Sequence, residues 1–309
     1  MRIIFFGTPD FAVPSLRALE DSGEDIIAVV TQPDRTKGRG HHVTAPPVKE
    51  HALSRDMALL QPEQIRSPEF LTALADLKPE ICVVVAYGKI VPPALLRLPP
   101  YGFINVHASI LPKYRGAAPI QWAIIRGETR TGVTTMHMNE GLDTGDTLLM
   151  AQTDITEEDT AVTLSARLSQ MGADLLVATL KGIRDGSVKS VPQTGEPSYA
   201  PIIRKADGRI DWNSSAHDLF NLARGMFPWP GAFGSFRGEK FTLLRTKVID
   251  DSAEGHPGRI ERIAGDEIDI ATGRGILSVI ELRPEGRQTM SGAAFARGRR
   301  LREGVHFDR

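Results

Sequence analysis

The chain has 309 residues, of which 41% are hydrophobic and 24% are charged, and this length allows two domains with buried cores. Its formal net charge of −1 excludes a broad positive field, so any contact with a polyanion must come from a local basic patch. The single cysteine excludes an intrachain disulfide and a cysteine-rich zinc site, and no apolar run reaches the roughly 18 residues of a membrane helix. We therefore expect a cytoplasmic protein that holds no metal.

The first third of the chain alternates between strand-like and helix-like segments. Short apolar runs at Arg2–Phe6, Asp25–Val30 and Glu80–Ala86 are typical of strands buried on both faces of a parallel sheet. Between them, Phe11–Glu20 and Pro68–Leu77 have helical spacing. This alternation predicts βαβ units in a doubly wound, mostly parallel Rossmann-like α/β sheet. The turn after the first strand lacks G-x-G-x-x-G, which argues against a dinucleotide pocket.

A basic segment, "TQPDRTKGRGHH", follows the second expected strand and spans Thr31–His42. Arg35, Lys37 and Arg39 lie there among glycines and without an apolar anchor. Two interpretations are open. The segment is either a solvated connector or an arm whose cations contact phosphates.

The segment "INVHASILPKYRGAAPIQ" carries polar side chains at the end of an apolar run. In an extended strand Asn105 and His107 share one face with Phe103, while Ile104 and Val106 point the other way. A buried histidine is often a hydrogen-bonded structural residue. An amide and an imidazole at the carboxyl end of a strand also indicate a ligand site, because open α/β sheets bind ligands there.

A hairpin and a long helix are expected next. Thr131–Met138 is a β-branched run, and Asp146–Ile155 can pair with it. Thr156, followed by acidic residues, predicts the start of a helix that closes at Gly182 or Gly186.

The amino-acid composition changes near residue 187, where Pro, Gly and polar residues become frequent. We expect a first domain over residues 1–189, a linker over 190–206 and a second domain over 207–309. The second domain carries one expected helix, Ser214–Arg224, and closely spaced short strands, which predict a small β barrel or sandwich. These strands are Ala232–Phe236, Lys240–Val248, Glu267–Ala271 and Ile276–Leu282.

Asp143, in the Gly-rich loop "NEGLDTGD" after the Thr131–Met138 run, completes a possible polar cluster with Asn105 and His107. A carboxylate fixes the tautomer of a histidine, and an amide donates a hydrogen bond to an oxyanion. The cluster suits direct transfer of an activated acyl group to an amine, without an enzyme nucleophile. A purely structural His–Asp pair is the alternative.

These segments together resemble the formyltransferases that use 10-formyltetrahydrofolate. The resemblance rests on Asn105-Val-His107, on the following loop Ser109–Gly116 and on Asp143. "GTPDF", "TQPDRTKGRG", "RGAAPIQ", "GLDTGD" and "PWPGAF" agree, in order and spacing, with the branch of the family that formylates methionyl-tRNA. Ala108 departs from the family, which commonly has glycine after the catalytic histidine.

The resemblance implies transfer of a formyl group from 10-formyltetrahydrofolate to the amino group of methionyl-initiator tRNA, for translation initiation. It implies no covalent enzyme intermediate, an OB-like β-barrel second domain and, we expect, a monomer. The implied catalytic residues are Asn105, His107 and Asp143. The implied folate-lining residues are Ser109, Ile110, Leu111 and Pro112. The expected tRNA contacts are Arg35, Lys37, Arg39 and Lys205.

Three other functions are open. A formyltransferase acting on a small amine, such as an amino-sugar nucleotide, shares the trio. A formyl-folate hydrolase needs the same oxyanion stabilisation. A noncatalytic folate-binding protein needs only the pocket.

Overall fold

The computed structural model describes residues 1–37 and 42–308. The chain forms two compact units, and the first comprises residues 1–119, 131–153 and 165–201. The second comprises residues 120–130, 154–164 and those from 202 onward. Arg39, one of the expected tRNA contacts, lies outside the described residues.

The first unit is built on a seven-stranded sheet in the order β10-β9-β7-β6-β1-β2-β5. Five neighbouring strands run parallel to one another, namely β7, β6, β1, β2 and β5. The next strand, β9, runs antiparallel to β7. The prediction of a mostly parallel α/β sheet is confirmed, and β9 and β10 lie side by side as expected. The strands are β1 (Arg2–Gly7), β2 (Asp25–Val30), β5 (Leu59–Leu60), β6 (Ile81–Val85), β7 (Phe103–His107), β9 (Arg130–His137) and β10 (Thr147–Asp154).

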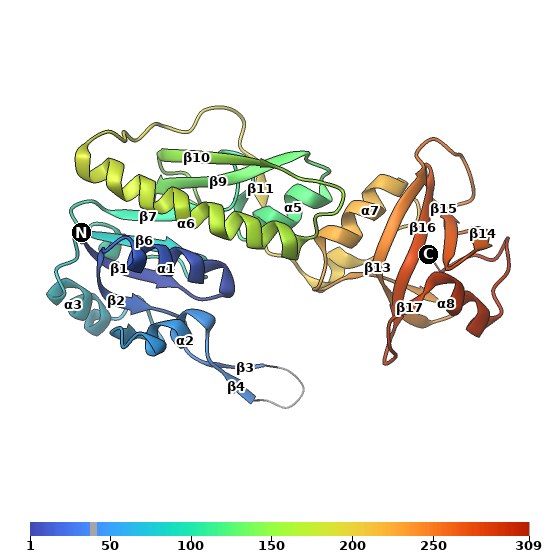
Figure 1. Cartoon of the computed structure of the whole chain (residues 1–309), viewed down its shortest axis with the longest axis horizontal. Coiled ribbons are helices and arrows are strands. Elements are labelled where there is room, and N and C mark those ends of the chain that lie inside the picture. The colour runs from blue at the N-terminus through green and yellow to red at the C-terminus, as the bar shows by residue number, and fades with distance from the viewer. Residues whose placement is uncertain (38–41, 309) are drawn as a thin grey trace. The chain divides into compact units, whose positions relative to one another are not determined.

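Helices cover both faces of this sheet. Phe103 packs in a buried cluster with Leu74 of α3, whereas Val106 lies against Gly172 of α6. The predicted alternation along β7 therefore holds, with Asn105 and His107 on the side of Phe103. Figure 1 shows α1 and α6 lying across the other face. The helices are η1 (Asp10–Ala12), α1 (Val13–Asp21), α2 (Pro47–Ser54), α3 (Pro68–Asp76), α4 (Pro93–Leu96) and α6 (Ala161–Asp185).

Helix α6 begins later than the sequence predicted. The N–H and hydroxyl of Thr156 both donate to Asp159 Oδ2, at 2.8 and 3.1 Å, and close a separate turn. Thr160 caps the helix instead, because its hydroxyl accepts from the N–H of Thr163 at 3.3 Å. The expected start at Thr156 is thus wrong by one turn. The expected end is confirmed, because the residue after the helix, Gly186, has φ +74°.

The basic segment contains two short strands that the sequence did not predict. β3 (Arg35–Lys37) and β4 (His42–Thr44) pair antiparallel, with Arg35 opposite Thr44. The ends of the segment are therefore fixed to each other by backbone hydrogen bonds.

The second unit contains an antiparallel sheet in the order β12-β13-β16-β15-β14, with β17 beside β16. The C-terminal segment joins its two edges. Ile260 of β14 donates to the Val305 carbonyl at 2.8 Å, and the Asp308 N–H donates to the Ser235 carbonyl of β12 at 3.1 Å. The strands are β12 (Ala232–Phe236), β13 (Glu239–Asp250), β14 (Ile260–Ala264), β15 (Glu267–Ala271), β16 (Ile276–Pro284) and β17 (Met290–Ser291). The helices of this part are α5 (Pro119–Ile125), η2 (Lys205–Gly208), α7 (Ala216–Gly225) and α8 (Gly292–Arg299).

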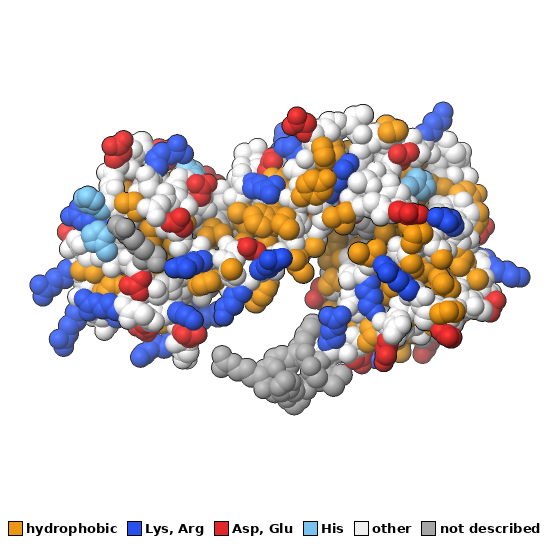
Figure 2. All heavy atoms as spheres, turned by 180° about the vertical axis from the view of Figure 1, so that it is seen from behind, with side chains coloured by type: hydrophobic (Ala, Val, Ile, Leu, Met, Phe, Trp, Pro, Cys, Tyr) orange, Lys and Arg blue, Asp and Glu red, His pale blue; other side chains and the backbone are white. Residues whose placement is uncertain are grey.

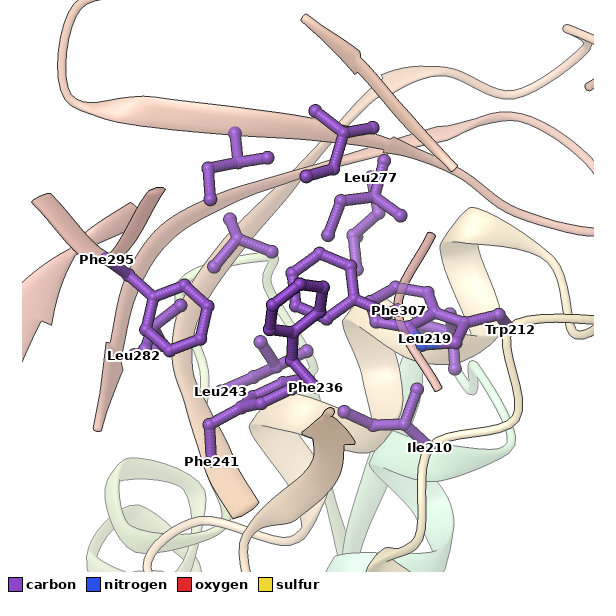
Figure 3. Close-up of a cluster of buried hydrophobic side chains, with 14 of the residues drawn as sticks. Ile210, Trp212, Leu219, Phe236, Phe241, Leu243, Leu277, Leu282, Phe295 and Phe307 are labelled. Atoms are coloured by element: carbon purple, nitrogen blue, oxygen red, sulfur yellow. The ribbon is translucent and has the colours of Figure 1, made fainter. Parts of the chain in front are cut away.

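Aromatic rings fill the interior of this second unit (Figure 3). Phe307 lies at their centre, with ring centroids 5.6 Å from Phe236 and 5.3 Å from Phe241. It also stacks on Phe295, and its ring is 5.6 Å from that of Trp212. The expected second domain of closely spaced short strands is confirmed, its sheet is antiparallel, and an aromatic core holds it together.

Candidate active site

The three expected catalytic residues meet beside the carboxyl end of β7. His107 is the last residue of this strand, Asn105 stands two residues before it, and Asp143 lies in the loop between β9 and β10. His107 Nδ1 is 3.7 Å from Asp143 Oδ2, and Asn105 Nδ2 donates to Asp143 Oδ1 at 3.4 Å. The side chains of His107 and Asp143 are only 6% and 15% exposed. The trio is thus a largely desolvated polar cluster, in which electrostatic interactions are strong.

The orientation of the imidazole ring follows from its second nitrogen. His107 Nε2 lies 2.9 Å from the carbonyl oxygen of Tyr114. Since a carbonyl oxygen only accepts, Nε2 must carry the hydrogen of this bond. The neutral ring then has its lone pair on Nδ1, on the side of Asp143. We infer from this partner that Nδ1 is the nitrogen that can accept a proton.

Asp143 is held in an unusual backbone conformation. Its φ is +50°, a region that aspartate adopts more readily than most residues. The N–H of Gly116 donates to its Oδ2 at 2.8 Å. Gly116 itself has φ +125°, and a Cβ atom there would lie 2.6 Å from the carbonyl oxygen of Ala200. Only glycine fits this position, which explains a glycine of the "YRG" sequence in physical terms.

The expected folate-lining loop follows β7 directly. Ser109 is fully buried, and its hydroxyl donates to the Lys113 carbonyl at 2.6 Å. The carbonyl of Ser109 accepts from the Thr134 hydroxyl at 2.7 Å. Leu111 is also buried, whereas Ile110 and Pro112 are partly exposed. The hydroxyl of Ser109 therefore fixes the loop, and the exposed surface of the loop is apolar.

The structure places the side chains of two of the four expected tRNA contacts, Arg35 and Lys205. Arg35 is exposed, and its guanidinium donates to Gln32 Oε1 at 2.6 Å. Lys37 is placed by its backbone in β3, and Arg39 is not described. Lys205 is an exposed residue of η2 in the second unit.

Three partners of the trio were missed by reasoning from sequence. They are the Tyr114 carbonyl, the Gly116 N–H and the side chain of Gln193, whose Nε2 donates to the Asp143 carbonyl at 2.8 Å. Two of them act through the backbone, and Gln193 is 50 positions from Asp143. No local pattern indicates such contacts. The glycine of "YRG" was the one available signal.

Two further titratable groups of the first unit, Cys82 and Tyr87, are buried. Burial raises the pKa of the Cys82 thiol, and it raises the pKa of Tyr87 to about 12, so both stay protonated near neutral pH. Within residues 1–37 and 42–308, no group of three or more His, Cys, Asp or Glu side chains is placed to hold a metal ion. None of the helices in that same part of the chain has the length and apolar character needed to cross a membrane.

Two family models match the chain. The Formyl transferase model matches residues 1–180, and the model of the formyl transferase C-terminal domain matches residues 202–300. The fold and these matches define a formyl transferase.

Closely similar proteins narrow this class. The methionyl-tRNA formyltransferase of Thermodesulfovibrio yellowstonii is 49% identical, over 98% of this chain and 97% of that protein. The enzyme of the same name from Pelotomaculum thermopropionicum is also 49% identical, over 99% of this chain and 98% of that protein. The chain belongs to the methionyl-tRNA formyltransferase family.

Solved structures share the fold at low sequence identity. The methionyl-tRNA formyltransferase of Clostridium thermocellum is 14% identical, with a TM-score of 0.55 over 80% of this chain and 93% of that chain. HypX from Aquifex aeolicus, in complex with tetrahydrofolic acid, is 18% identical, with a TM-score of 0.61 over 99% of this chain and 50% of that chain. At such identities the likeness concerns the fold alone.

Proposed function

We propose that the chain transfers the formyl group of 10-formyltetrahydrofolate to the α-amino group of methionine on initiator tRNA. The observation that carries this proposal is the meeting of Asn105, His107 and Asp143 in one desolvated cluster, with the nitrogen Nδ1 facing the carboxylate. No serine, cysteine or lysine nucleophile is needed, because the amine of the substrate attacks the formyl carbon itself.

His107 moves the proton in this scheme. Transfer joins the amine nitrogen to the formyl carbon and breaks the bond from that carbon to the folate nitrogen. The amine loses a proton, and Nδ1 of His107 accepts it. Nε2 cannot do so, because it already carries the hydrogen that it donates to the Tyr114 carbonyl. The same proton then passes from Nδ1 to the departing folate nitrogen. Asp143 stabilises the positive ring between these steps, since its Oδ2 is 3.7 Å from Nδ1.

Asn105 stabilises the negative charge that develops on the formyl oxygen. Its contact with Asp143 is long, at 3.4 Å, so the amide is weakly engaged and can donate to an oxyanion. A preorganised donor in a site with little water costs no reorganisation when the charge appears. The amide adds no charge of its own, which leaves the His107–Asp143 pair undisturbed.

The loop Ser109–Pro112 forms a wall of the folate site in this proposal. Ile110 and Pro112 offer partly exposed apolar surface to a flat ring system. Ser109 and Leu111 are buried, and their backbone hydrogen bonds with the Thr134 hydroxyl hold the loop in place. An apolar wall beside a polar trio suits a molecule that carries both an aromatic ring and a reactive formyl group.

The tRNA is contacted by a few local basic residues. A broad positive surface is not what binds it. Figure 2 shows Lys and Arg side chains interspersed with Asp and Glu over one face, and the formal net charge is −1. We assign phosphate contacts to Arg35, Lys37, Arg39 and Lys205. A few cations on a hairpin and on η2 suit recognition of one nucleic acid rather than nonspecific binding.

We further propose that the protein acts as a monomer in the cytoplasm. The proposed organisation is a formyltransferase domain over residues 1–189, a linker over 190–206 and a second domain over 207–309. The ranges of the two family matches, 1–180 and 202–300, support this division.

The test measures three products from 10-formyltetrahydrofolate. N-formylmethionyl-tRNA should form in the presence of methionyl-initiator tRNA, with negligible release of free formate in its absence. Rapid formate release without an amine would favour a hydrolase, and formylation of an amino-sugar nucleotide alone would favour the small-amine reading. Folate binding without any turnover would identify a noncatalytic protein.

A further inference from the structure

A short segment after α6 contacts both loops that form the candidate site. We call residues 191–200 the strap. Val191 exchanges two backbone hydrogen bonds of 2.8 Å with Thr147, at the end of the Asp143 loop. At its other end, Tyr199 and Ala200 form β11, which pairs in parallel with Arg115 and Gly116, the short strand β8. The strap therefore bridges the loop after β7 and the loop after β9.

Gln193 is the one partly buried side chain in a run of exposed residues from 191 to 197. Its Nε2 donates to the carbonyls of Asp143 and Gly145, both at 2.8 Å. Its Oε1 accepts from Arg115, from Nε at 3.1 Å and from Nη2 at 2.6 Å. Both amide hydrogens and both lone pairs are thus used, which is the full capacity of this side chain.

The strap also supports the residue that orients His107. The Ser198 hydroxyl accepts from the N–H of Tyr114 at 2.9 Å, and the Ser198 carbonyl accepts from Arg115 at 2.8 Å. Tyr114 has φ +60°, a left-handed conformation that is unfavourable for an aromatic residue. Its carbonyl is the one that accepts from His107 Nε2. Two left-handed residues, Tyr114 and Asp143, are therefore each held by a hydrogen bond with the strap: Tyr114 donates to Ser198, and Asp143 accepts from Gln193.

We infer that Gln193 is a positioning residue for formyl transfer, acting through the backbone of Asp143. Its amide fixes the carbonyls of Asp143 and Gly145 and ties them, through Arg115, to the loop that holds His107. The distance between Asp143 Oδ2 and His107 Nδ1 then depends on Gln193. This inference rests on the proposed function, because positioning is defined by the reaction that it supports.

The test uses two replacements of similar size in the full-length chain. Gln193→Glu keeps an acceptor for Arg115 but loses both donated hydrogen bonds, and Gln193→Met loses all four. Both should lower kcat for formyl transfer to methionyl-tRNA by about 10- to 100-fold, since a misplacement near 1 Å can cost about that much. Affinity for tetrahydrofolate should stay within about twofold, and Tm should change by only a few degrees. Thr194→Ala, a truncation of the exposed neighbouring side chain, is the matched control and should keep full activity.

Each other result overturns the inference. A kcat within about twofold of the unmodified protein in either variant removes the positioning role. Loss in Gln193→Glu with normal turnover in Gln193→Met would assign the effect to the new charge rather than to the lost donors. A parallel loss of folate affinity or of Tm would make Gln193 a binding or structural residue. Failure of the proposed function is distinguishable, because the unmodified protein and Thr194→Ala would then also be inactive.

Discussion

The loops around His107 are held by hydrogen bonds, whereas the interior of the second unit is held by packed aromatic rings. Around His107, the left-handed residues Tyr114 and Asp143 keep their conformation because donors and acceptors from distant segments bind them. In the second unit, Phe307 is buried among other rings and makes no such polar contact with its ring.

Activity and stability therefore depend on different parts of the molecule. Polar groups arranged for chemistry seldom stabilise a fold strongly and sometimes reduce its stability. A buried aromatic side chain contributes mainly through apolar burial and packing. Replacements in the first region should therefore change turnover at nearly constant stability, and replacements in the second should do the opposite.

The largest expected effect is on turnover in the trio. His107→Ala removes the proton acceptor and Asp143→Ala removes its stabilising charge, so each should lower kcat by about 10²- to 10⁴-fold. Thermal melting should shift by only a few degrees. Turnover with methionyl-tRNA and a thermal melt on the same sample check both statements. Activity within a few-fold of the unmodified protein would refute the catalytic assignment, and a large drop in Tm would favour a structural histidine.

The reverse result is expected for Phe307→Ala. Truncating this buried ring should lower the free energy of unfolding of the second unit by about 3–5 kcal/mol, because it leaves a cavity among the other aromatic rings. Turnover should stay nearly normal at temperatures where the protein is folded. Calorimetry resolves this unit if the two units melt separately. Ile249→Ala, at a side chain that is 43% exposed in β13, is the control and should change stability by less than about 0.5 kcal/mol.

Asn105→Asp tests whether the trio needs an uncharged donor at this position. The replacement keeps the size of the side chain but puts a negative charge where the oxyanion develops, beside the carboxylate of Asp143. We expect kcat to fall by about 10²- to 10³-fold, at least as far as in Asn105→Ala. Single-turnover rates for both variants decide the matter. Near-normal transfer by Asn105→Asp would exclude an oxyanion role for this residue.

Much of the fold was accessible from sequence, because hydrophobic periodicity is a local signal. The apolar runs at β1, β2 and β6 predict strands buried on both faces, and all three lie inside the sheet. The missed elements lack that signal. β5 has only two residues, and α8 reads "GAAFARGR", whose two glycines disfavour a helix in isolation. Packing against the sheet of the second unit stabilises α8 where propensity does not.

In the candidate site, too, the sequence predicts the residues with a local signal and misses the contacts that depend on tertiary structure. The chemistry of the three side chains, Asn105, His107 and Asp143, can be predicted from the sequence. Their proximity follows from the order of the strands in the sheet. The groups that orient them are backbone atoms and one distant amide. A carbonyl such as that of Tyr114 has no sequence signature, and the contact from Gln193 depends on how the chain returns after a 25-residue helix. Such contacts require tertiary structure to be seen.

The smallest expected effect concerns the basic segment, which belongs to neither kind of region. Arg39→Ala should weaken the use of tRNA and leave the affinity for tetrahydrofolate unchanged, because a phosphate contact acts only on the nucleic acid. Binding of tRNA should also become less dependent on salt, by a slope of about one unit or less for the single lost contact. The effect extends to kcat if the amine is no longer held within attacking distance. Arg130→Ala changes the net charge equally at a residue paired with Asp154 at 2.9 Å, and it should leave the salt slope unaltered. Equal slopes for Arg39→Ala and the unmodified protein would return the segment to a solvated connector and strengthen the case for a small-amine substrate.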